Sequence, residues 1–495
     1  MKSPRFVWAS ALLIVLGTIT AVLLVRSRPA DAAVAGTGSV DDPSASVFLP
    51  LVYADYVPSS DRLCRLGVGG GQTIGAYDVN SLRLGWYLDW TATLSPESPG
   101  GIGYMPMVRL SQTGPYTSSY SFEPGETQIL AIAAEQRGVT WLIGNEPDRR
   151  VYQDSLEPHV YATAYHDLYH LIKTADPSAR IAAGGIVQPT PLRLQYLDMV
   201  LDSYSLSYGE MMPVDVWNIH AFILQEKAGE WGADIPPGID ATEGELYTID
   251  DNGSVEIFRE GIVRFRDWMA AAGYRDRPLV ITEFGIQMPP DYGFPPERVG
   301  AYLRDTFGYL LSASDSTTGY PYDDNRLVQN WAWYSLTDDN FNGWLFDETT
   351  TERTVYGDHY AAYSAAMTAT VNLVPVDLRV SQVYSESGQV VSATLQAAVA
   401  NNGNVHGGPA AVTLYLGDPL QGGSLVAEQT VWGYAGCGET VVVEGSWLTA
   451  VAGDSEICVI VDQHNQVSEV DETDNLLCTE LSLLGHVTDA RSTEP

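Results

Sequence analysis

The feature that most constrains the fold is a regular alternation of segment types between residues 47 and 370. Short apolar segments typical of buried strands alternate there with longer segments of helical periodicity. We predict eight strands, at 63–70, 82–90, 103–110, 139–146, 180–187, 214–222, 278–285 and 328–336. We predict five helices between them, at 127–138, 159–176, 192–204, 255–273 and 296–314.

Strands that alternate with helices pair in parallel through right-handed crossovers. Eight such units over this length match an α/β fold of the (β/α)8 (TIM) barrel type. A doubly wound open sheet is the alternative. The run GVGGG at 67–71 lacks the G-x-G-x-x-G spacing of a phosphate-binding loop and indicates a flexible turn. The sequence therefore favours the barrel.

The pattern changes after residue 371. Segments of alternating hydrophobicity follow, separated by turn sequences such as NNGN and GDPLQGG. Such a pattern is typical of an all-β immunoglobulin-like sandwich. We therefore expect a barrel domain at 47–370, a sandwich at 371–485 and a flexible tail at 486–495.

The N-terminus predicts export. Lys2 and Arg5 precede an uncharged apolar run at 6–25, and two arginines follow it. A basic start with an apolar run is typical of a signal peptide, and this run is also long enough to span a bilayer. Residues 1–28 are therefore a cleaved signal peptide or an uncleaved anchor, and 29–46 form a linker. We expect the remaining chain to be extracellular, secreted or membrane-anchored.

Net charge excludes one class of partner. The chain has 62 acidic and 26 basic residues, for a formal charge of −36. Nucleic acids and anionic membrane surfaces are bound by basic patches. We therefore expect no nucleic-acid partner, and the acidity itself favours solubility.

Four cysteines are too few and too scattered for a disulfide scaffold or a zinc site. Export permits disulfides. We expect Cys458 and Cys478 to pair, because both lie in short apolar strands near the C-terminus. The sequence leaves the connectivity of Cys64 and Cys437 open.

Two glutamates end predicted strands of the barrel. The fourth strand ends in Asn145-Glu146-Pro147 and the seventh in Thr282-Glu283-Phe284. Catalytic groups of (β/α)8 barrels lie at the C-terminal ends of the strands. Alternation along a strand groups Glu146 with Leu142, and Glu283 with Ile281. We therefore expect both carboxyl groups to point into the mouth of the barrel.

Paired carboxyl groups across a cleft are the catalytic groups of glycoside hydrolysis. One donates a proton to the leaving oxygen, and the other attacks the sugar or activates water. Proximity raises the pKa of one member, because two nearby carboxylates resist ionising together. The sequence therefore predicts a glycosidase that requires no metal and no cofactor.

The motifs NEP and TEF resemble clan A of the retaining glycoside hydrolases. That resemblance implies that Glu146 is the acid/base, Glu283 the nucleophile and Asn145 a contact to the sugar 2-hydroxyl. The segments GWYLDW (85–90), YMPMVRL (104–110), NEPD (145–148), NIHAF (218–222) and ITEFG (281–285) resemble, in order, the landmarks of the Asl1-like catalytic domain, which includes β-1,3-glucanases of family 128.

Three observations bear on that family assignment. Asp89 stands where the resemblance would place Asn, and a long insertion at 223–254 separates the sixth strand from the seventh. The segment DPSAR (176–180) is also similar to family 39 and its relatives. They put the glucan substrate in question more than the hydrolase activity.

Further side chains are candidates for substrate binding. His220 ends the sixth strand, where clan A relatives place a residue near the nucleophile. Trp333 and Trp331 on the eighth strand have flat apolar faces that suit stacking on a sugar, although tryptophans there also suit the core. The remaining candidates, each with a purely structural alternative, are Trp86, Asp89, Trp90 and Arg109.

The sandwich has its own resemblance. VANNGNVHGG (399–408) and QVSEVDETDN (466–475) resemble landmarks of the CARDB module, a bacterial adhesion-type immunoglobulin-like domain. Asp474 replaces one Asn of the second landmark. The acidic loop there indicates a solvated hairpin, with a calcium site as the alternative. Such a module would place the enzyme near a cell wall or a cell-surface glycan.

These observations together predict an exported retaining glycoside hydrolase that cleaves a polysaccharide, with β-glucan, and β-1,3-glucan in particular, as the first choice. The alternative is a non-catalytic carbohydrate-binding or adhesion protein on a degenerate barrel.

Overall fold

The structure is a computed structural model that describes residues 47–48, 63–71, 73–114, 118–384, 390–438, 440–447 and 455–481. The predicted signal peptide or anchor, the linker and the tail at 486–495 lie outside these residues. Among the described helices, none combines the length and the apolar character that a bilayer crossing requires.

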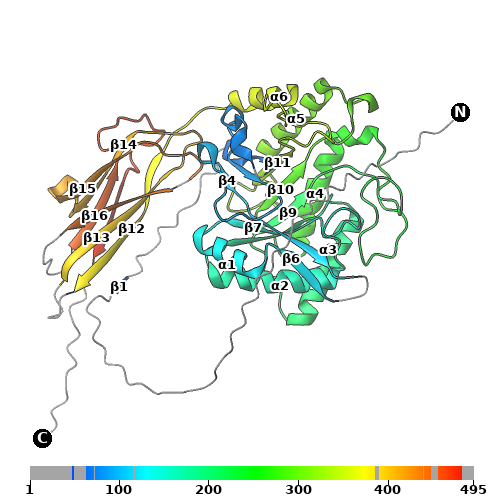
Figure 1. Cartoon of the computed structure of the whole chain (residues 1–495), viewed down its shortest axis with the longest axis horizontal. Coiled ribbons are helices and arrows are strands. Elements are labelled where there is room, and N and C mark those ends of the chain that lie inside the picture. The colour runs from blue at the N-terminus through cyan, green and yellow to red at the C-terminus, as the bar shows by residue number, and fades with distance from the viewer. Residues whose placement is uncertain are drawn as a thin grey trace, which may run out of the picture. The chain divides into compact units, whose positions relative to one another are not determined.

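Eight parallel strands form a closed barrel, as predicted (Figure 1). In ring order they are β2 (Leu66–Gly69), β3 (Trp86–Leu88), β4 (Gly103–Tyr104) continuing into β5 (Met107–Gln112), β7 (Thr140–Asn145), β8 (Arg180–Gly185), β9 (Trp217–His220), β10 (Leu279–Phe284) and β11 (Asn330–Tyr334). Pairing of β11 with β2 closes the ring, and isolated parallel bridges join β8 to β9. The strand β6 (Tyr120–Glu123) forms an antiparallel hairpin with β5.

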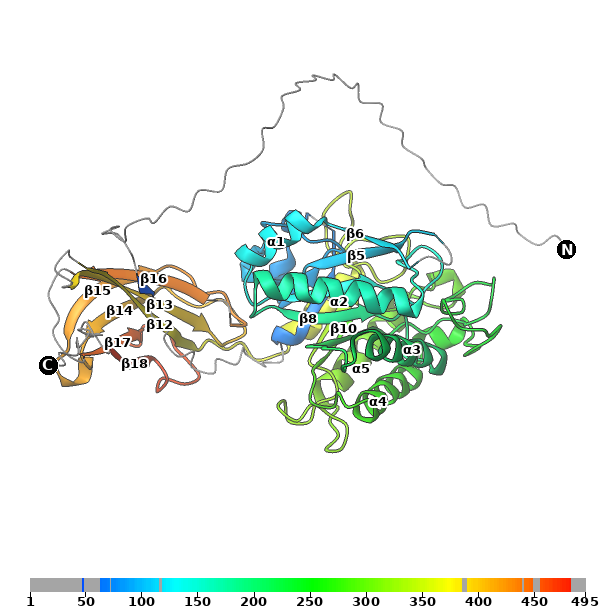
Figure 2. The same cartoon turned by 90° about the horizontal axis from the view of Figure 1, so that it is seen from below.

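Helices cover the outside of this barrel, and Figure 2 shows α2, α3, α4 and α5 beside the strands. They are α1 (Glu126–Glu135), α2 (Pro158–Ala175), α3 (Pro191–Tyr208), α4 (Val255–Ala271), α5 (Pro296–Ser312) and α6 (Val355–Ala365). The first five confirm the predicted helices, and α6 was not predicted. Short 3-10 turns replace helices in the connections from β2 to β3 and from β3 to β4.

Alternate side chains of the strands fill the barrel interior. One buried cluster takes members from or beside every strand position of the ring except β2: Trp86, Leu88, Met107, Leu142, Ala182, Val216, Val280 and Ala332. Residues at the intervening positions, such as Ile143 and Trp331, belong to the larger core between strands and helices. This alternation decides which residues near the strand ends reach the mouth.

The C-terminal part is a two-sheet sandwich, as predicted. Its strands are β12 (Leu373–Tyr384), β13 (Val390–Asn401), β14 (Ala410–Leu416), β15 (Ser424–Val431), β16 (Thr440–Trp447), β17 (Ser455–Val461) and β18 (Leu476–Leu481). One sheet has the order β1-β12-β13-β16 and the other β15-β14-β17-β18. The strand β1 (Val47–Phe48), at the predicted start of the barrel domain, pairs with β12 in the first sheet.

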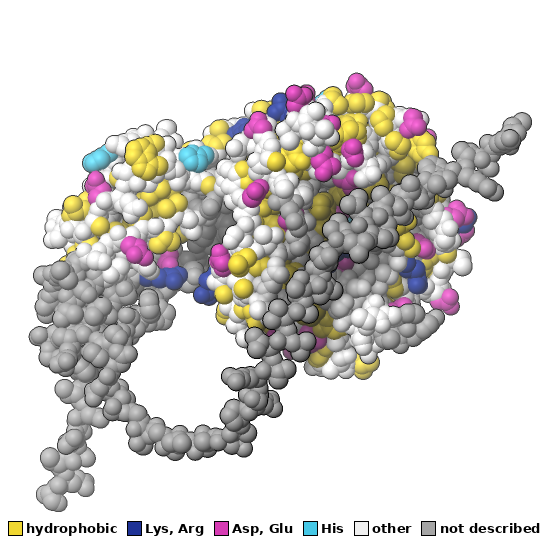
Figure 3. All heavy atoms as spheres, viewed as in Figure 1, with side chains coloured by type: hydrophobic (Ala, Val, Ile, Leu, Met, Phe, Trp, Pro, Cys, Tyr) yellow, Lys and Arg dark blue, Asp and Glu magenta, His cyan; other side chains and the backbone are white. Residues whose placement is uncertain are grey.

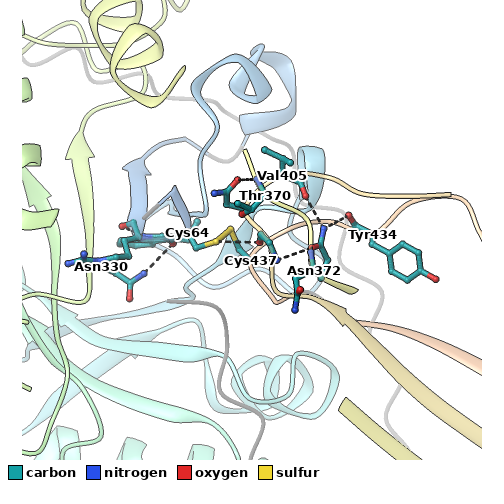
Figure 4. The surroundings of a disulfide bond; sticks show 12 residues. Cys64, Asn330, Thr370, Asn372, Val405, Tyr434 and Cys437 are labelled. Carbon is teal, nitrogen blue, oxygen red and sulfur yellow. Dashed lines mark hydrogen bonds between the residues drawn. A yellow bond between two sulfur atoms is a disulfide. The ribbon is translucent and has the colours of Figure 1, made fainter. Parts of the chain in front are cut away.

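Both disulfides lie within the described residues. Cys458 and Cys478 face each other on β17 and β18 and form the predicted bond. Cys64, which precedes β2, is bonded to Cys437 of the sandwich (Figure 4). The second bond joins residues 373 positions apart, so it links the barrel covalently to the sandwich.

Candidate active site

Glu146 follows the last residue of β7 and has a left-handed backbone, with φ of 46°. This conformation is uncommon for a residue with a side chain and persists where the surroundings fix it. Its N–H donates to the Gly185 carbonyl on β8 at 3.0 Å, and only 1% of the residue is exposed. The turn at the end of β7 thus holds a carboxyl group inside the barrel mouth.

Glu283 enters the mouth for a different reason from the predicted one. Its neighbours Leu279 and Ile281 belong to the outer core, so regular alternation would turn Glu283 outward. The pairing of β10 with both neighbouring strands shifts register after Ile281. A β-bulge changes the direction of the side chains that follow it. Glu283 therefore faces inward, 4% exposed, and the parity argument for this strand was wrong although its conclusion holds.

His220, the last residue of β9, lies between the two glutamates. Its Nδ1 is 2.9 Å from Glu146 Oε1, and its Nε2 is 3.5 Å from Glu283 Oε1. The imidazole is fully buried. One oxygen of each carboxyl group and one imidazole nitrogen all lie within 4.8 Å of one another. The structure therefore brings together three of the predicted site residues.

Two further side chains hold the carboxyl groups. Arg149 donates from Nη1 to Glu146 Oε2 at 3.0 Å. Trp90 donates from its indole Nε1 to Glu283 Oε1 at 2.6 Å. Sequence reasoning missed Arg149, because one arginine three residues after a glutamate forms no recognisable pattern. Trp90, one of the candidates from the sequence, packs against the same inner cluster as Trp86 and Leu88.

The two carboxyl groups have opposite pKa shifts. Burial opposes the ionisation of Glu146, but the Arg149 guanidinium and the His220 ring outweigh it and hold the pKa of Glu146 at about 2. Burial raises the pKa of Glu283, and the nearby Glu146 raises it further. For His220, burial lowers the pKa, but Glu283 and Glu146 raise it above its ordinary value. In the unliganded site, Glu146 therefore ionises more readily than Glu283.

Asn145 and Arg109 belong to a polar network beside Glu146. Gln153 Oε1 accepts hydrogen bonds from Asn145 Nδ2 at 2.9 Å and from Arg109 Nη2 at 3.1 Å. Arg109 also forms an ion pair with Asp154 at 2.7 Å, and its side chain stays one-third exposed. The Oδ1 atom of Asn145 is buried and has no hydrogen-bond partner among the described residues. That oxygen is thus free to accept from a bound ligand.

Trp333 and Trp331 do not lie in the mouth. Because Ala332 points into the barrel, both indoles point outward toward the helices. Trp333 is fully buried, packs on Phe284 and Phe307, and donates to the Gly343 carbonyl at 2.8 Å. Trp331 is also fully buried. The expectation of sugar platforms was therefore wrong, because apolar residues on both faces of this strand concealed its orientation.

The eighth strand instead presents Tyr334. Its ring lies 5.8 Å from the Trp90 ring and 5.9 Å from that of Phe222. Its hydroxyl donates to Asp338 at 2.5 Å. Tyr334 and Trp90 are thus the aromatic side chains beside the carboxyl groups.

Trp86 and Asp89 are also outside the reach of a substrate. Trp86 lies inside the barrel below the mouth, 3% exposed, and donates to the Arg65 carbonyl at 3.1 Å. Asp89 lies on the opposite strand face and accepts from the Tyr104 hydroxyl at 2.6 Å. The prediction that they bind substrate was wrong, because Trp90 takes the position nearest the carboxyl groups.

The insertion at 223–254 is fastened to the loop that carries Glu146. Arg193, the fully buried first-turn arginine of α3, forms ion pairs with Asp148 at 2.8 Å and with Glu226 at 3.0 Å. Its Nη2 also donates to the carbonyls of Ala233 and Asp234. The insertion therefore forms a fixed wall beside the acidic pair.

Glu146, His220 and Glu283 are residue types that also bind metals. Here Arg149 and Trp90 already donate to the carboxyl oxygens, and the positive charge of a guanidinium repels a cation. A second group of metal-ligand types, around Glu456, includes Cys458 and Cys478, which are bonded to each other. The donor set of the barrel mouth therefore suits proton transfer more than metal binding.

Comparison with known proteins gives results for both parts of the chain. The CARDB family model matches residues 374–479, in agreement with the predicted module. A comparison with curated proteins finds no relative. The structure of a family 128 (subgroup II) endo-β-1,3-glucanase from Sorangium cellulosum is 17% identical, covers 61% of this chain and 98% of its own, and has a TM-score of 0.40.

Two further structures are similar to parts of the chain. A monomeric β-xylosidase from Caulobacter crescentus is 12% identical, covers 84% of this chain and 98% of its own, and has a TM-score of 0.42. The CARDB domain of a Pyrococcus furiosus protein, solved in complex with di-metal ions, is 23% identical, covers 23% of this chain and 88% of its own, and has a TM-score of 0.19.

Proposed function

We propose that this protein is an exported retaining glycoside hydrolase that acts on a polysaccharide. The observation that supports this most directly is the pair of buried carboxyl groups, Glu146 and Glu283, with oxygen atoms within 4.8 Å of each other. Retaining glycosidases place the two carboxyl groups about 5–5.5 Å apart, and inverting ones about 6.5–9.5 Å apart. The short gap favours the retaining mechanism.

The proposed reaction is a double displacement. Glu283 attacks the anomeric carbon while the protonated Glu146 gives its proton to the leaving glycosidic oxygen. Glu146 then takes a proton from the water that attacks the glycosyl-enzyme, and Glu283 is released as a carboxylate. Trp90 holds Glu283 in place through a hydrogen bond to its Oε1, and His220 Nε2 lies 3.5 Å from the same oxygen.

The proposed substrate is a β-glucan, with β-1,3 linkages as the first choice. Asn145 supports binding of a sugar, because its buried Oδ1 is free to accept from a hydroxyl group. Trp90 and Tyr334 provide aromatic surface beside the carboxyl groups. The linkage itself rests on the resemblance of the strand-end motifs to those of family 128.

The proposal also covers the location of the protein and the class of partner that its charge excludes. Export follows from the basic, apolar N-terminus, and the CARDB module would hold the enzyme near a cell wall or cell-surface glycan. Acidic side chains are scattered over the face shown in Figure 3, and the net charge is −36. Both argue against a nucleic-acid substrate.

A non-catalytic carbohydrate-binding protein is the second candidate, favoured by one observation. The guanidinium of Arg149 lies on the carboxyl group that must be protonated for catalysis. A barrel that had lost activity would tolerate that ion pair permanently, and the cleft would still bind sugar.

Hydrolysis of a panel of β-glucans by the wild type and by Glu146→Gln and Glu283→Gln separates the two. If the protein is an enzyme, the wild type releases reducing ends and both variants lose this activity. A wild type that binds β-glucan but cleaves none of the panel would establish the binding protein. Near-full activity in either variant would remove that glutamate from the mechanism.

A further inference from the structure

We propose that Arg149 is a displaceable cap on the acid/base Glu146: in the unliganded protein its guanidinium occupies the position that the leaving-group oxygen of the substrate takes, and a bound sugar moves it away. This proposal rests on the proposed glycosidase function and names Arg149 as a positioning residue.

The cap follows from the hydrogen-bonding needs of a carboxylic acid. Both oxygens of Glu146 are engaged, Oε1 with His220 Nδ1 at 2.9 Å and Oε2 with Arg149 Nη1 at 3.0 Å. A guanidinium has N–H donors and no acceptor. A proton on Oε2 would therefore face another proton. Glu146 becomes a general acid only when an acceptor, such as a glycosidic oxygen, replaces Arg149 on Oε2.

The Arg149 side chain is more exposed than the carboxyl group that it contacts. Its side chain is 20% exposed, whereas the side chains of Glu146 and His220 are 1% and 0% exposed. Its other contact, from Nη2 to the Gly232 carbonyl of the insertion, is long at 3.5 Å. Trp231, the residue before Gly232 in the chain, is 40% exposed. A sugar that enters beside the insertion would therefore contact Arg149, the more exposed of the two side chains that bind Glu146.

The ionisable groups around Glu146 explain why this contact controls it. His220 on β9, Glu283 on β10 and Tyr334 on β11 face Glu146 across the mouth, and Asp148 lies on its own loop. Burial favours a neutral Glu146, and a charged Glu283 or Asp148 adds to this effect. Only Arg149 and His220 favour its ionised form, and His220 also serves Glu283. Removal of Arg149 therefore raises the pKa of Glu146.

The test measures the ionisation of Glu146 directly. The full chain carries glutamate labelled with ¹³C at the side-chain carboxyl, and Glu146→Gln identifies the Glu146 signal. We expect Arg149→Met to raise the titration midpoint of Glu146 by about one to two pH units. Arg150→Met is the matched control, because Arg150 contacts the same insertion through the Ile235 and Pro236 carbonyls but forms no ion pair with Glu146. It should leave the midpoint in place.

A ligand then tests displacement. A β-1,3-linked glucose trisaccharide should raise the Glu146 midpoint in the wild type and in Arg150→Met, and much less in Arg149→Met. An unchanged midpoint in Arg149→Met, or equal sugar-induced shifts in all three proteins, would overturn the cap. Arg149→Gln replaces Arg149→Met if thermal unfolding shows that the methionine variant is not folded.

Kinetic measurements distinguish the proposed role of Arg149 from the glycosidase function on which that proposal rests. The alkaline limb of kcat/KM reports the free enzyme, and that of kcat reports the complex. We expect Arg149→Met to move the limb of kcat/KM upward by about one pH unit or more and to leave that of kcat nearly unchanged. Hydrolysis by the wild type with equal midpoints in wild type and Arg149→Met would refute the cap alone. If the Glu146 midpoint is raised in Arg149→Met but the wild type cleaves no glucan, only the proposed enzymatic function is refuted.

Discussion

The barrel pairs buried carboxyl groups at one strand end with arginines, whereas a half-buried carboxyl group of the sandwich accepts hydrogen bonds from neutral donors. Around the end of β7, Glu146, Asp148 and Asp154 each form an ion pair with an arginine. In the sandwich, Glu469 accepts hydrogen bonds from the Leu373 backbone and from Asn475, and no described lysine or arginine forms an ion pair with it. Burial raises the pKa of Glu469 to about 7.

That difference shows where the chain places its few cations. Basic residues number 26 against 62 acidic ones, and three arginines nonetheless meet carboxylates at one strand end of the barrel. An arginine favours the charged form of a buried carboxyl group, whereas burial favours the neutral form. The pKa of Glu146 is lowered, but burial keeps those of Asp148 and Asp154 raised. Among these three groups, the pairing therefore controls the charge of Glu146 most strongly.

The largest expected effect concerns the two unequal partners of the acidic pair. Glu146→Ala and Glu283→Ala should each lose activity on a glucan by about 10⁴-fold or more. With an aryl glycoside that has a good leaving group, azide should rescue both. It should give a β-glycosyl azide with Glu146→Ala and an α-glycosyl azide with Glu283→Ala, because the first variant keeps the nucleophile and the second does not. Reversed products, analysed by NMR, would exchange the two roles.

The second effect concerns the buried arginine between two carboxylates. Arg193→Met leaves Asp148 and Glu226 buried without their partner. The free energy of unfolding of the barrel should fall by about 3–5 kcal/mol. Arg304→Met, at an exposed position of α5, is the control and should change it by less than about 0.5 kcal/mol. Equal urea unfolding curves for the two variants would show that this network contributes no stability.

The third effect compares two indoles. Trp90→Phe removes the N–H that Glu283 accepts, and a hydrogen bond to a charged group contributes about 1.5–3 kcal/mol, so kcat should fall about tenfold to a hundredfold. Trp333→Phe removes a hydrogen bond to the Gly343 backbone carbonyl on the outer side of β11. It should lower the unfolding free energy by about 1–2 kcal/mol with kcat unchanged. A loss of kcat in Trp333→Phe comparable to that in Trp90→Phe would contradict the orientation of β11.

The smallest effect lies in the sandwich. The pKa of Glu469 rises from 4.5 in the unfolded chain to about 7 in the fold, so the stability it contributes is present below pH 4.5 and is lost as pH rises through 7. Glu469→Gln keeps a neutral side chain at every pH. Above pH 7 it should stabilise the sandwich by about 1 kcal/mol, reduced for partial exposure, measured as slower hydrogen exchange of β13. Slower exchange in the wild type above pH 7 would reverse the sign.

Much of the barrel could be predicted because its signal is repeated. Each of the eight strands is an apolar run with turn residues at its end, and an error in one run would not change the fold. Cys458 and Cys478 were predictable because both lie in neighbouring strands of one hairpin. Cys64 and Cys437 are 373 positions apart, and local patterns give no information over that distance.

A site residue could be predicted only where a residue type with a clear chemical use stands at the end of a predicted strand. Glu146 and His220 met that condition. The direction of Glu283 depends on a β-bulge that leaves no local mark in LVITEF. The tryptophans of β11 are flanked by apolar residues on both faces, so alternation could not assign them. Arg149 could not be predicted, because its contact with Glu146 depends on the turn that follows β7.

The central claim is a retaining double displacement by Glu146 and Glu283, and the most direct test is the configuration of the first product. Proton NMR during the first minutes of cleavage of a β-1,3-linked glucan oligosaccharide distinguishes the two anomers before they equilibrate. The account predicts that the β-anomer appears first and the α-anomer grows in later. An α-anomer that appears first would contradict it.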